Sequence, residues 1–270
     1  MRRVLLLGVS SAFPRAASDP TSFLVEIMEP CAGARAAPDQ APPDVPGAFI
    51  LVDCGGIPLQ RLLAMGRDPA RMIALAITHT HPDHLGGLPL LIHGLRMLGR
   101  TAPLPVIGHD LSLAASRRLL EAVGLTEEKG FPITWIEMPR ERRGTITVPP
   151  FEITTFAVRH SRATLGLRIE TGGRALVYSS DTGPGSDVAR EARGAAILLH
   201  EMGAEDDAGH PFHSSPADLA AVARDAEPGR LVIVHAPPLD WTAKSSVLAQ
   251  VHREFAGPVE FGEPGSSYLF

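Results

Sequence analysis

Three histidines and one aspartate lie within six consecutive positions, directly after an apolar run. His79, His81, Asp83 and His84 follow the run Met72–Ile77 and precede a Gly-Gly pair. Imidazole and carboxylate groups bind Zn²⁺, Mn²⁺ and Fe²⁺ in proteins. A strand that ends in such a cluster directs several ligands into one small volume. Because hydrolases often use a pair of ions about 3.5–4 Å apart, the cluster predicts a metal site for hydrolysis.

Three further candidate ligands occur later, each at the end of a short apolar run. They are His160, Asp181 and His235, which follow the strand-like segments 151–158, 175–178 and 231–234. Strands of one sheet bring the groups that follow them to one edge. We therefore expect all seven side chains to converge in the seam between two sheets.

The order of these ligands resembles the metallo-β-lactamase superfamily, whose signature is H-x-H-x-D-H followed by a His, a bridging Asp and a final His. The resemblance implies an αββα sandwich that holds two divalent ions, Zn²⁺ in the first place, with Mn²⁺ or Fe²⁺ as alternatives. The ligands it implies are His79, His81 and His160 for one ion, Asp83, His84 and His235 for the other, and Asp181 between them. Asp83 would also orient the metal-bound hydroxide that attacks the substrate.

Two later motifs resemble the ribonuclease Z branch of this superfamily. The segment Leu198–Met202 resembles its His-Glu-Ala strand end, and His213-Ser214-Ser215 resembles its His-Ser-Thr turn. The resemblance implies that Glu201 orients His213, which gives a proton to the departing oxygen of a phosphodiester. Such a substrate needs this help because its leaving alkoxide is a strong base. The alternative is that the pair only braces the metal ligands.

The chain departs from ribonuclease Z in the segment where that branch carries a long arm for clamping tRNA. Only twenty residues separate His160 from Asp181, which is room for two strands and a Gly172-Gly173 turn. The net charge of −5 gives no general attraction to nucleic acid. We therefore expect a small or nucleotide-like phosphodiester as substrate, and we do not expect large RNA.

Three other functions fit a chain of this kind. A tRNA 3′-end processing endoribonuclease and a lactonase or thioesterase would use the same seven ligands. A lactonase would not need the proton donor formed by Glu201 and His213. A binding module without catalysis would be expected to have lost ligands, and all seven are present.

Composition favours a globular cytoplasmic protein. Hydrophobic residues make up 44% of the 270 positions, and no apolar run approaches the roughly 18 residues of a membrane span. The run Val4–Val9 after Met1-Arg2-Arg3 is better explained by a first strand than by a signal peptide. Cys31 and Cys54 alone make no disulfide framework. We expect no membrane partner and leave a homodimer open.

Apolar periodicity and turn residues predict one α/β domain over residues 1–270. The expected strands are Val4–Val9, Ser22–Ile27, Phe49–Asp53, Ile73–Thr78, Pro105–Ile107, Ile133–Glu137, Phe151–Val158, Leu165–Glu170, Ala175–Tyr178, Ala195–His200 and Leu231–Val234. The expected helices are Pro58–Met65, Pro89–Leu98, Leu111–Val123, Ser186–Ala192, Pro216–Asp225 and Ser245–Phe255.

Two remaining features lie outside this pattern. The segment Pro30–Gly47 has five prolines and no periodicity, so we expect an exposed, mobile loop. His109 follows a strand and precedes Asp110, where it is expected as a helix cap or a substrate contact.

Overall fold

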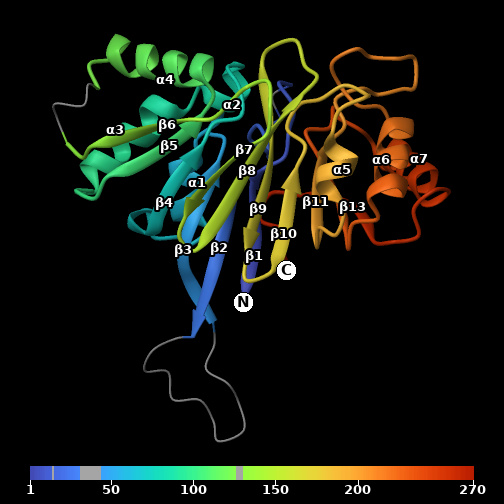
Figure 1. The fold of residues 1–270 in the computed structure, drawn as a ribbon, viewed down its shortest axis with the longest axis horizontal. Helices are drawn as coiled ribbons and strands as arrows, with labels where there is room; N and C mark the ends of the chain where they lie inside the picture. The colour runs from blue at the N-terminus through green and yellow to red at the C-terminus, as the bar shows by residue number, and fades with distance from the viewer. Residues whose placement is uncertain (14, 31–43, 126–129) are drawn as a thin grey trace, which may run out of the picture.

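A computed structural model describes residues 1–13, 15–30, 44–125 and 130–270. Two β-sheets pack face to face in the centre, and helices cover the outer face of each sheet (Figure 1). The predicted αββα sandwich is thereby confirmed.

Seven strands of the described chain form each sheet. The first sheet has the order β14 (Ser267–Leu269), β1 (Arg2–Gly8), β2 (Ser22–Pro30), β3 (Asp44–Val52), β4 (Met72–Ala76), β5 (Leu104–Gly108) and β6 (Ile133–Glu137). The second has the order β13 (Val259–Phe261), β12 (Leu231–Val234), β11 (Ile197–Glu201), β10 (Arg174–Tyr178), β9 (Thr164–Thr171), β8 (Phe151–Val158) and β7 (Gly144–Val148).

The helices divide between the two outer faces. Those beside the first sheet are α1 (Pro58–Ala64), the short η1 (Pro69–Arg71), α2 (Pro82–Leu85), α3 (Leu88–Met97) and α4 (Asp110–Ala122). Those beside the second sheet are α5 (Val188–Ala192), α6 (Pro216–Ala226) and α7 (Trp241–His252). Among the described helices, none combines the length and apolar character needed to cross a membrane.

Three separate groups of buried apolar side chains hold these layers together. The central group joins the sheets and includes Phe23 of β2 and Tyr178 of β10, whose rings meet edge to face at 5.0 Å. A second group lies between the first sheet and α1, α3 and α4. A third lies between the second sheet and α5, α6 and α7. The apolar stripes of strands and helices therefore serve packing, which leaves the strand ends for chemistry.

The ladders explain why polar strand ends from distant parts of the chain meet. Strands β3 to β6 pair in parallel, and so do β10 to β13. Strands β9 and β10 form the expected antiparallel hairpin, and Gly172 and Gly173 take the positive φ values of its turn. No long arm is inserted in this hairpin.

Some boundaries differ from the sequence prediction. Strands β7, β13 and β14 were not predicted. Helix α7 begins at Trp241, because the Asp240 side chain accepts a hydrogen bond from the Ala243 N–H at 2.8 Å. The predicted loop Pro30–Gly47 is too long at both ends, since Pro30 belongs to β2 and Asp44–Gly47 belong to β3. The rest of that segment, residues 31–43, lies outside the described residues.

Candidate metal centre

The histidine-rich cluster lies on the segment between β4 and α2. Pro82 occupies the first turn of α2, which suits its fixed φ, and the short helix presents Asp83 and His84. Loop backbone packs against this turn, because the Cys54 N–H donates to the His84 carbonyl at 2.8 Å. At Gly55 a Cβ atom would lie 1.6 Å from the Asp83 carbonyl oxygen, so only glycine permits this close approach.

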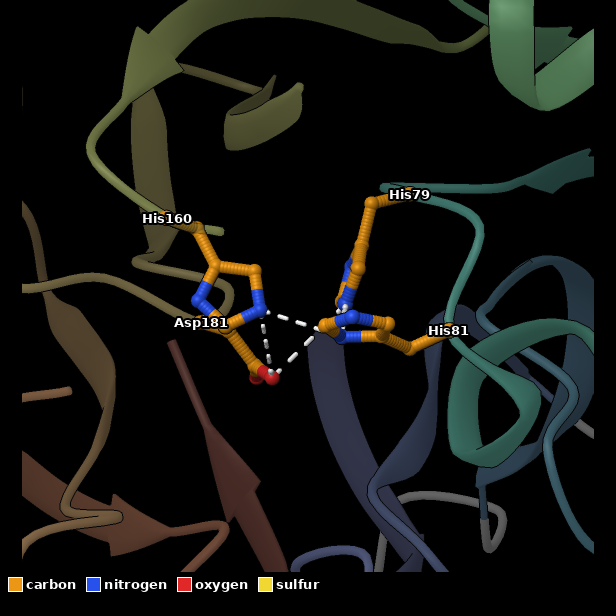
Figure 2. A group of neighbouring side chains, drawn as sticks. All are labelled: His79, His81, His160 and Asp181. Carbon is orange, nitrogen blue, oxygen red and sulfur yellow. Dashed lines mark hydrogen bonds and ion pairs between the residues drawn. The ribbon is translucent and has the colours of Figure 1, made fainter. Parts of the chain in front are cut away.

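One group of four donors joins the cluster to the second sheet. Figure 2 shows the rings of His79, His81 and His160 and the carboxylate of Asp181 pointing toward one another. His81 Nδ1 lies 3.1 Å from both His79 Nε2 and His160 Nε2. Asp181 Oδ2 lies 3.7 Å from each of the same two Nε2 atoms.

A second group of four donors shares the same aspartate. His235 Nε2 lies 3.3 Å from Asp83 Oδ2 and 3.4 Å from Asp181 Oδ1. His84 Nε2 lies 3.5 Å from Asp83 Oδ2 and 3.3 Å from Asp181 Oδ1. The two oxygens of Asp181 therefore face different groups, which is the arrangement a bridging carboxylate requires.

These separations fit metal ligands. Tetrahedral zinc ligands at 2.0–2.1 Å from the ion lie about 3.4 Å from one another, and the contacts given above for the two groups measure 3.1–3.7 Å, with all donor atoms of each group within 4.8 Å of one another. His84 Nε2 and Asp181 Oδ1 are buried 3.3 Å from each other, and neither makes a hydrogen bond of good geometry within the described residues. Buried polar atoms normally have a partner, so the residues present fit a pair of divalent ions.

Charge in this site is poorly balanced by the protein alone. Burial lowers the pKa of His79 and of His160, which leaves both rings neutral with a lone pair to offer. Burial also acts to lower the pKa of His84, but the carboxylates of Asp181 and Asp53 outweigh it and raise that pKa well above its ordinary value. A cation bound by His84 would take the place of this proton.

Asp53 is a site residue that the sequence reasoning missed. Its Oδ2 lies 2.8 Å from His84 Nδ1, and its Oδ1 accepts a hydrogen bond from the Thr78 N–H at 2.9 Å. The contact orients His84 in the manner of carboxylates behind metal-bound histidines. The signal available in the sequence was an aspartate directly after an apolar strand and before Cys54-Gly55. In the structure this aspartate is fully buried.

The backbone at the site is strained at three points. Among the described non-glycine residues, only four have positive φ, and three of them are Asp53, Ser180 and His235. Each follows a strand end and either belongs to the candidate site or precedes Asp181. Such conformations cost about 1–3 kcal/mol each and persist where surrounding structure holds them.

Glu201 and His213 lie together at the edge of the second donor group. Glu201 Oε2 lies 3.3 Å from His213 Nδ1, and the His213 ring stacks on that of His235 with centroids 5.6 Å apart. Burial acts to lower the pKa of His213, but the hydrogen bond and charge of Glu201 outweigh it, so the pKa is raised. The predicted pair is therefore brought together beside the donors.

Glu201 also accepts hydrogen bonds from three backbone segments. Its Oε1 accepts hydrogen bonds from the backbone N–H groups of Ser214 at 2.7 Å and Thr182 at 3.2 Å, and Oε2 accepts one from Gly203. The carboxylate is fully buried. It therefore joins the segment after β10, the end of β11 and the loop that carries His213.

Comparison with known proteins agrees with this geometry. The family model described as the β-lactamase superfamily domain matches residues 49–236. Ribonuclease Z of Mycolicibacterium paratuberculosis is 31% identical over 252 residues, covering 80% of this chain and 86% of the relative. Ribonuclease Z of Mycobacterium bovis is 28% identical over 294 residues, covering 97% and 96%.

A solved structure supports the same fold. The metallo-β-lactamase fold protein YhfI from Bacillus subtilis superposes with a TM-score of 0.77 at 22% identity, covering 99% of this chain and 98% of that one. The family match, the ribonuclease Z relatives and the donor geometry lead to one assignment. The chain belongs to the metallo-β-lactamase superfamily and is a metal-dependent hydrolase similar to ribonuclease Z.

Proposed function

We propose that this protein is a dinuclear phosphodiesterase that acts on a small or nucleotide-like phosphodiester. One ion would be held by His79, His81 and His160, the other by Asp83, His84 and His235, with Asp181 between them. Zn²⁺ is the ion we favour, with Mn²⁺ or Fe²⁺ as alternatives. When bound, two such ions supply Lewis acidity and lower the pKa of a bound water.

In this proposal Asp83 orients the attacking water. Its Oδ2 makes the contacts to His84 and His235, while Oδ1 takes part in neither. The side chain is 11% exposed, whereas that of Asp181 is 2% exposed. A carboxylate oxygen that is not used in these contacts can accept a hydrogen bond from water and fix the direction of its lone pair.

The observation that carries the choice of a phosphodiester is the contact of His213 with Glu201. A histidine whose pKa is raised by a buried carboxylate keeps its proton to higher pH than a free imidazole, and it can deliver that proton to a leaving oxygen. With Nδ1 facing Glu201, the delivering atom is Nε2. A thioester releases a thiolate, which is a better leaving group than an alkoxide and does not need this donor.

A leaving-group comparison tests the proposal. We expect His213→Ala to lower turnover of an alkyl phosphodiester by roughly 10²–10⁴-fold, the usual contribution of a general acid. Turnover of a p-nitrophenyl diester should barely change, because p-nitrophenolate departs unaided. Metal content, measured by elemental analysis, should remain that of the unmodified protein.

Equal slowing of both substrates, or loss of metal, would show that His213 only braces the ligands. His210→Ala is a matched control, since this histidine lies three positions away in the same loop and its ring is 5.1 Å from that of His213. Faster hydrolysis of a lactone than of either diester would favour a lactonase.

The second candidate function is tRNA 3′-end processing. It is favoured by one observation, that relatives 28–31% identical along most of the chain carry the name ribonuclease Z. The short β9–β10 hairpin favours a smaller substrate, because no arm is inserted between His160 and Asp181. We further propose that residues 1–270 act as one unit in the cytoplasm, where the buried Cys54 thiol would stay reduced.

A further inference from the structure

A cavity of about 350 Å³ opens beside the candidate metal centre and plays no part in the chemistry above. Its wall includes Thr80, which lies between the donors His79 and His81, and Arg162, two positions after His160. Burial is the largest influence on the pKa of His81, and the Arg162 guanidinium is close enough to lower it further. The cavity is therefore a neighbour of the reacting centre.

The cavity carries uncompensated positive charge. Arg118 from α4 and Arg162 both line it, and none of the described carboxylates does. Within the described chain, neither guanidinium has an ion pair or a side-chain hydrogen bond, and the nearby Asp110 is already paired with Arg140 at 3.3 Å. In a chain whose net charge is −5, two unpaired arginines on one cavity wall favour an anionic ligand.

His109 adds a buried donor to the same wall. Its Nδ1 accepts a hydrogen bond from the Ser112 N–H at 3.4 Å, at the start of α4, while the Asp110 carboxylate is farther, at 3.6 Å. Burial lowers the pKa of His109, more than Asp110 and the Ala163 backbone raise it, so the ring is neutral.

The tautomer of that neutral ring follows from the cap. Because Nδ1 accepts, the proton lies on Nε2. Nε2 is fully buried and makes no hydrogen bond with the described residues. That atom has almost no accessible surface, so the His109 ring shapes the wall beside α4, while the two arginines carry the charge that a ligand would meet.

We propose that the cavity lined by Arg118, Arg162 and His109 binds a second phosphoryl group of the substrate, remote from the phosphodiester that is cleaved. The inference rests on the proposed phosphodiesterase function. Two arginines on one wall can bind phosphate oxygens through several charge-assisted hydrogen bonds. The cavity volume lies within the roughly 300–1,000 Å³ of small-molecule sites. The substrate class is therefore a phosphodiester that also carries a terminal phosphate.

A ladder of bisphosphonates tests this inference by binding, without any need for turnover. Zinc-loaded protein is titrated by calorimetry with alkanes of one to six carbons that carry a phosphonate at both ends. Alkylphosphonates of equal length serve as the reference. We expect one chain length to bind at least about tenfold more tightly than its reference, because its second phosphonate reaches the arginines.

Variants locate that gain in the cavity. Arg118→Ala and Arg162→Ala should each reduce the preference for the bisphosphonate about tenfold. Arg117→Ala is the control, because its guanidinium lies over the Trp135 ring outside the cavity and the preference should persist.

Two results would overturn the inference. One is that no bisphosphonate binds better than its alkylphosphonate, and the other is that the gain survives both arginine substitutions. Diester hydrolysis is measured on the same samples. Hydrolysis without a bisphosphonate gain would remove only the second phosphoryl site, whereas a gain without hydrolysis would remove the proposed reaction and leave the anion site.

Discussion

Asp181 is the residue on which both donor groups depend. Its Oδ2 faces His79 and His160, its Oδ1 faces His84 and His235, and its side chain is 2% exposed. By contrast, His81 contributes to one group alone and is partly exposed. The seven candidate ligands are therefore unequal in what their removal should cost.

We expect Asp181→Ala to remove a ligand from both ions and His81→Ala to remove one from a single ion. After equilibrium dialysis against zinc, elemental analysis should show less metal in Asp181→Ala than in His81→Ala. Circular dichroism checks that both variants fold. Equal metal contents in two folded variants would mean that Asp181 does not bridge.

The sequence alone was sufficient to predict that the seven candidate ligands lie together. It was not sufficient to predict the residues that orient them. Asp83, His84 and the later donors stand next to strand ends, so chain order and strand packing determine their meeting. Asp53 acts through one side-chain contact across 31 positions to His84. A contact of that kind leaves no periodic pattern in the sequence. Glu201 was expected to orient His213, but its three backbone contacts became visible only in the fold.

At the scale of elements, the turn that carries Asp83 and His84 depends on close backbone packing. Besides Gly55, the Gly87 N–H donates to the Cys54 carbonyl at 2.7 Å. A Cβ atom on Gly87 would lie 2.1 Å from the Gly56 carbonyl oxygen. The loop after β3 is thus packed against α2 with no room for side chains.

We expect Gly55→Ala to displace α2 and to lower both metal content and stability, the latter by about 1–3 kcal/mol as in other overpacked sites. Gly173→Ala is the matched control. It should cost about 1–2 kcal/mol because its φ is +76°, but no atom lies within 4 Å of its added Cβ. Urea unfolding and elemental analysis separate the two effects, since only Gly55→Ala should lose metal. Full metal retention there would contradict the packing argument.

Short edge strands explain most of what the sequence did not predict about the elements. Strands β13 and β14 have three residues each, and their side chains are half-buried or exposed. Alternation cannot be read from so few positions. They pair only because longer neighbours, β12 and β1, offer free edges. Longer elements such as β8 and α4 have enough periodic positions to be placed within one or two residues.

At the scale of the whole molecule, the substrate should follow from what surrounds the site. The chain is acidic overall, and the β9–β10 connection is a tight hairpin. Affinity for RNA depends on many contacts between phosphates and basic groups. Ribonuclease Z relatives of similar length cover most of this chain. Cleavage of precursor tRNA can therefore be compared directly between this protein and those relatives.

We expect weak or no cleavage of precursor tRNA at its 3′ end at low enzyme concentration and near-physiological salt. Gel analysis of the RNA checks this, with hydrolysis of bis(p-nitrophenyl) phosphate by the same preparation as the positive control. Efficient cleavage would contradict the argument from the missing arm and would favour tRNA processing as the function.

The described contacts between donors measure 3.1–3.7 Å, and three apolar cores pack around the strands that carry these residues. Mixed imidazole and carboxylate donors accept several first-row divalent metals, and intrinsic affinities follow the same order in most such sites. We therefore expect the metal that this protein carries to vary with the ions available to it, so that cultures grown on different metal supplements should yield the same fold with different metal contents.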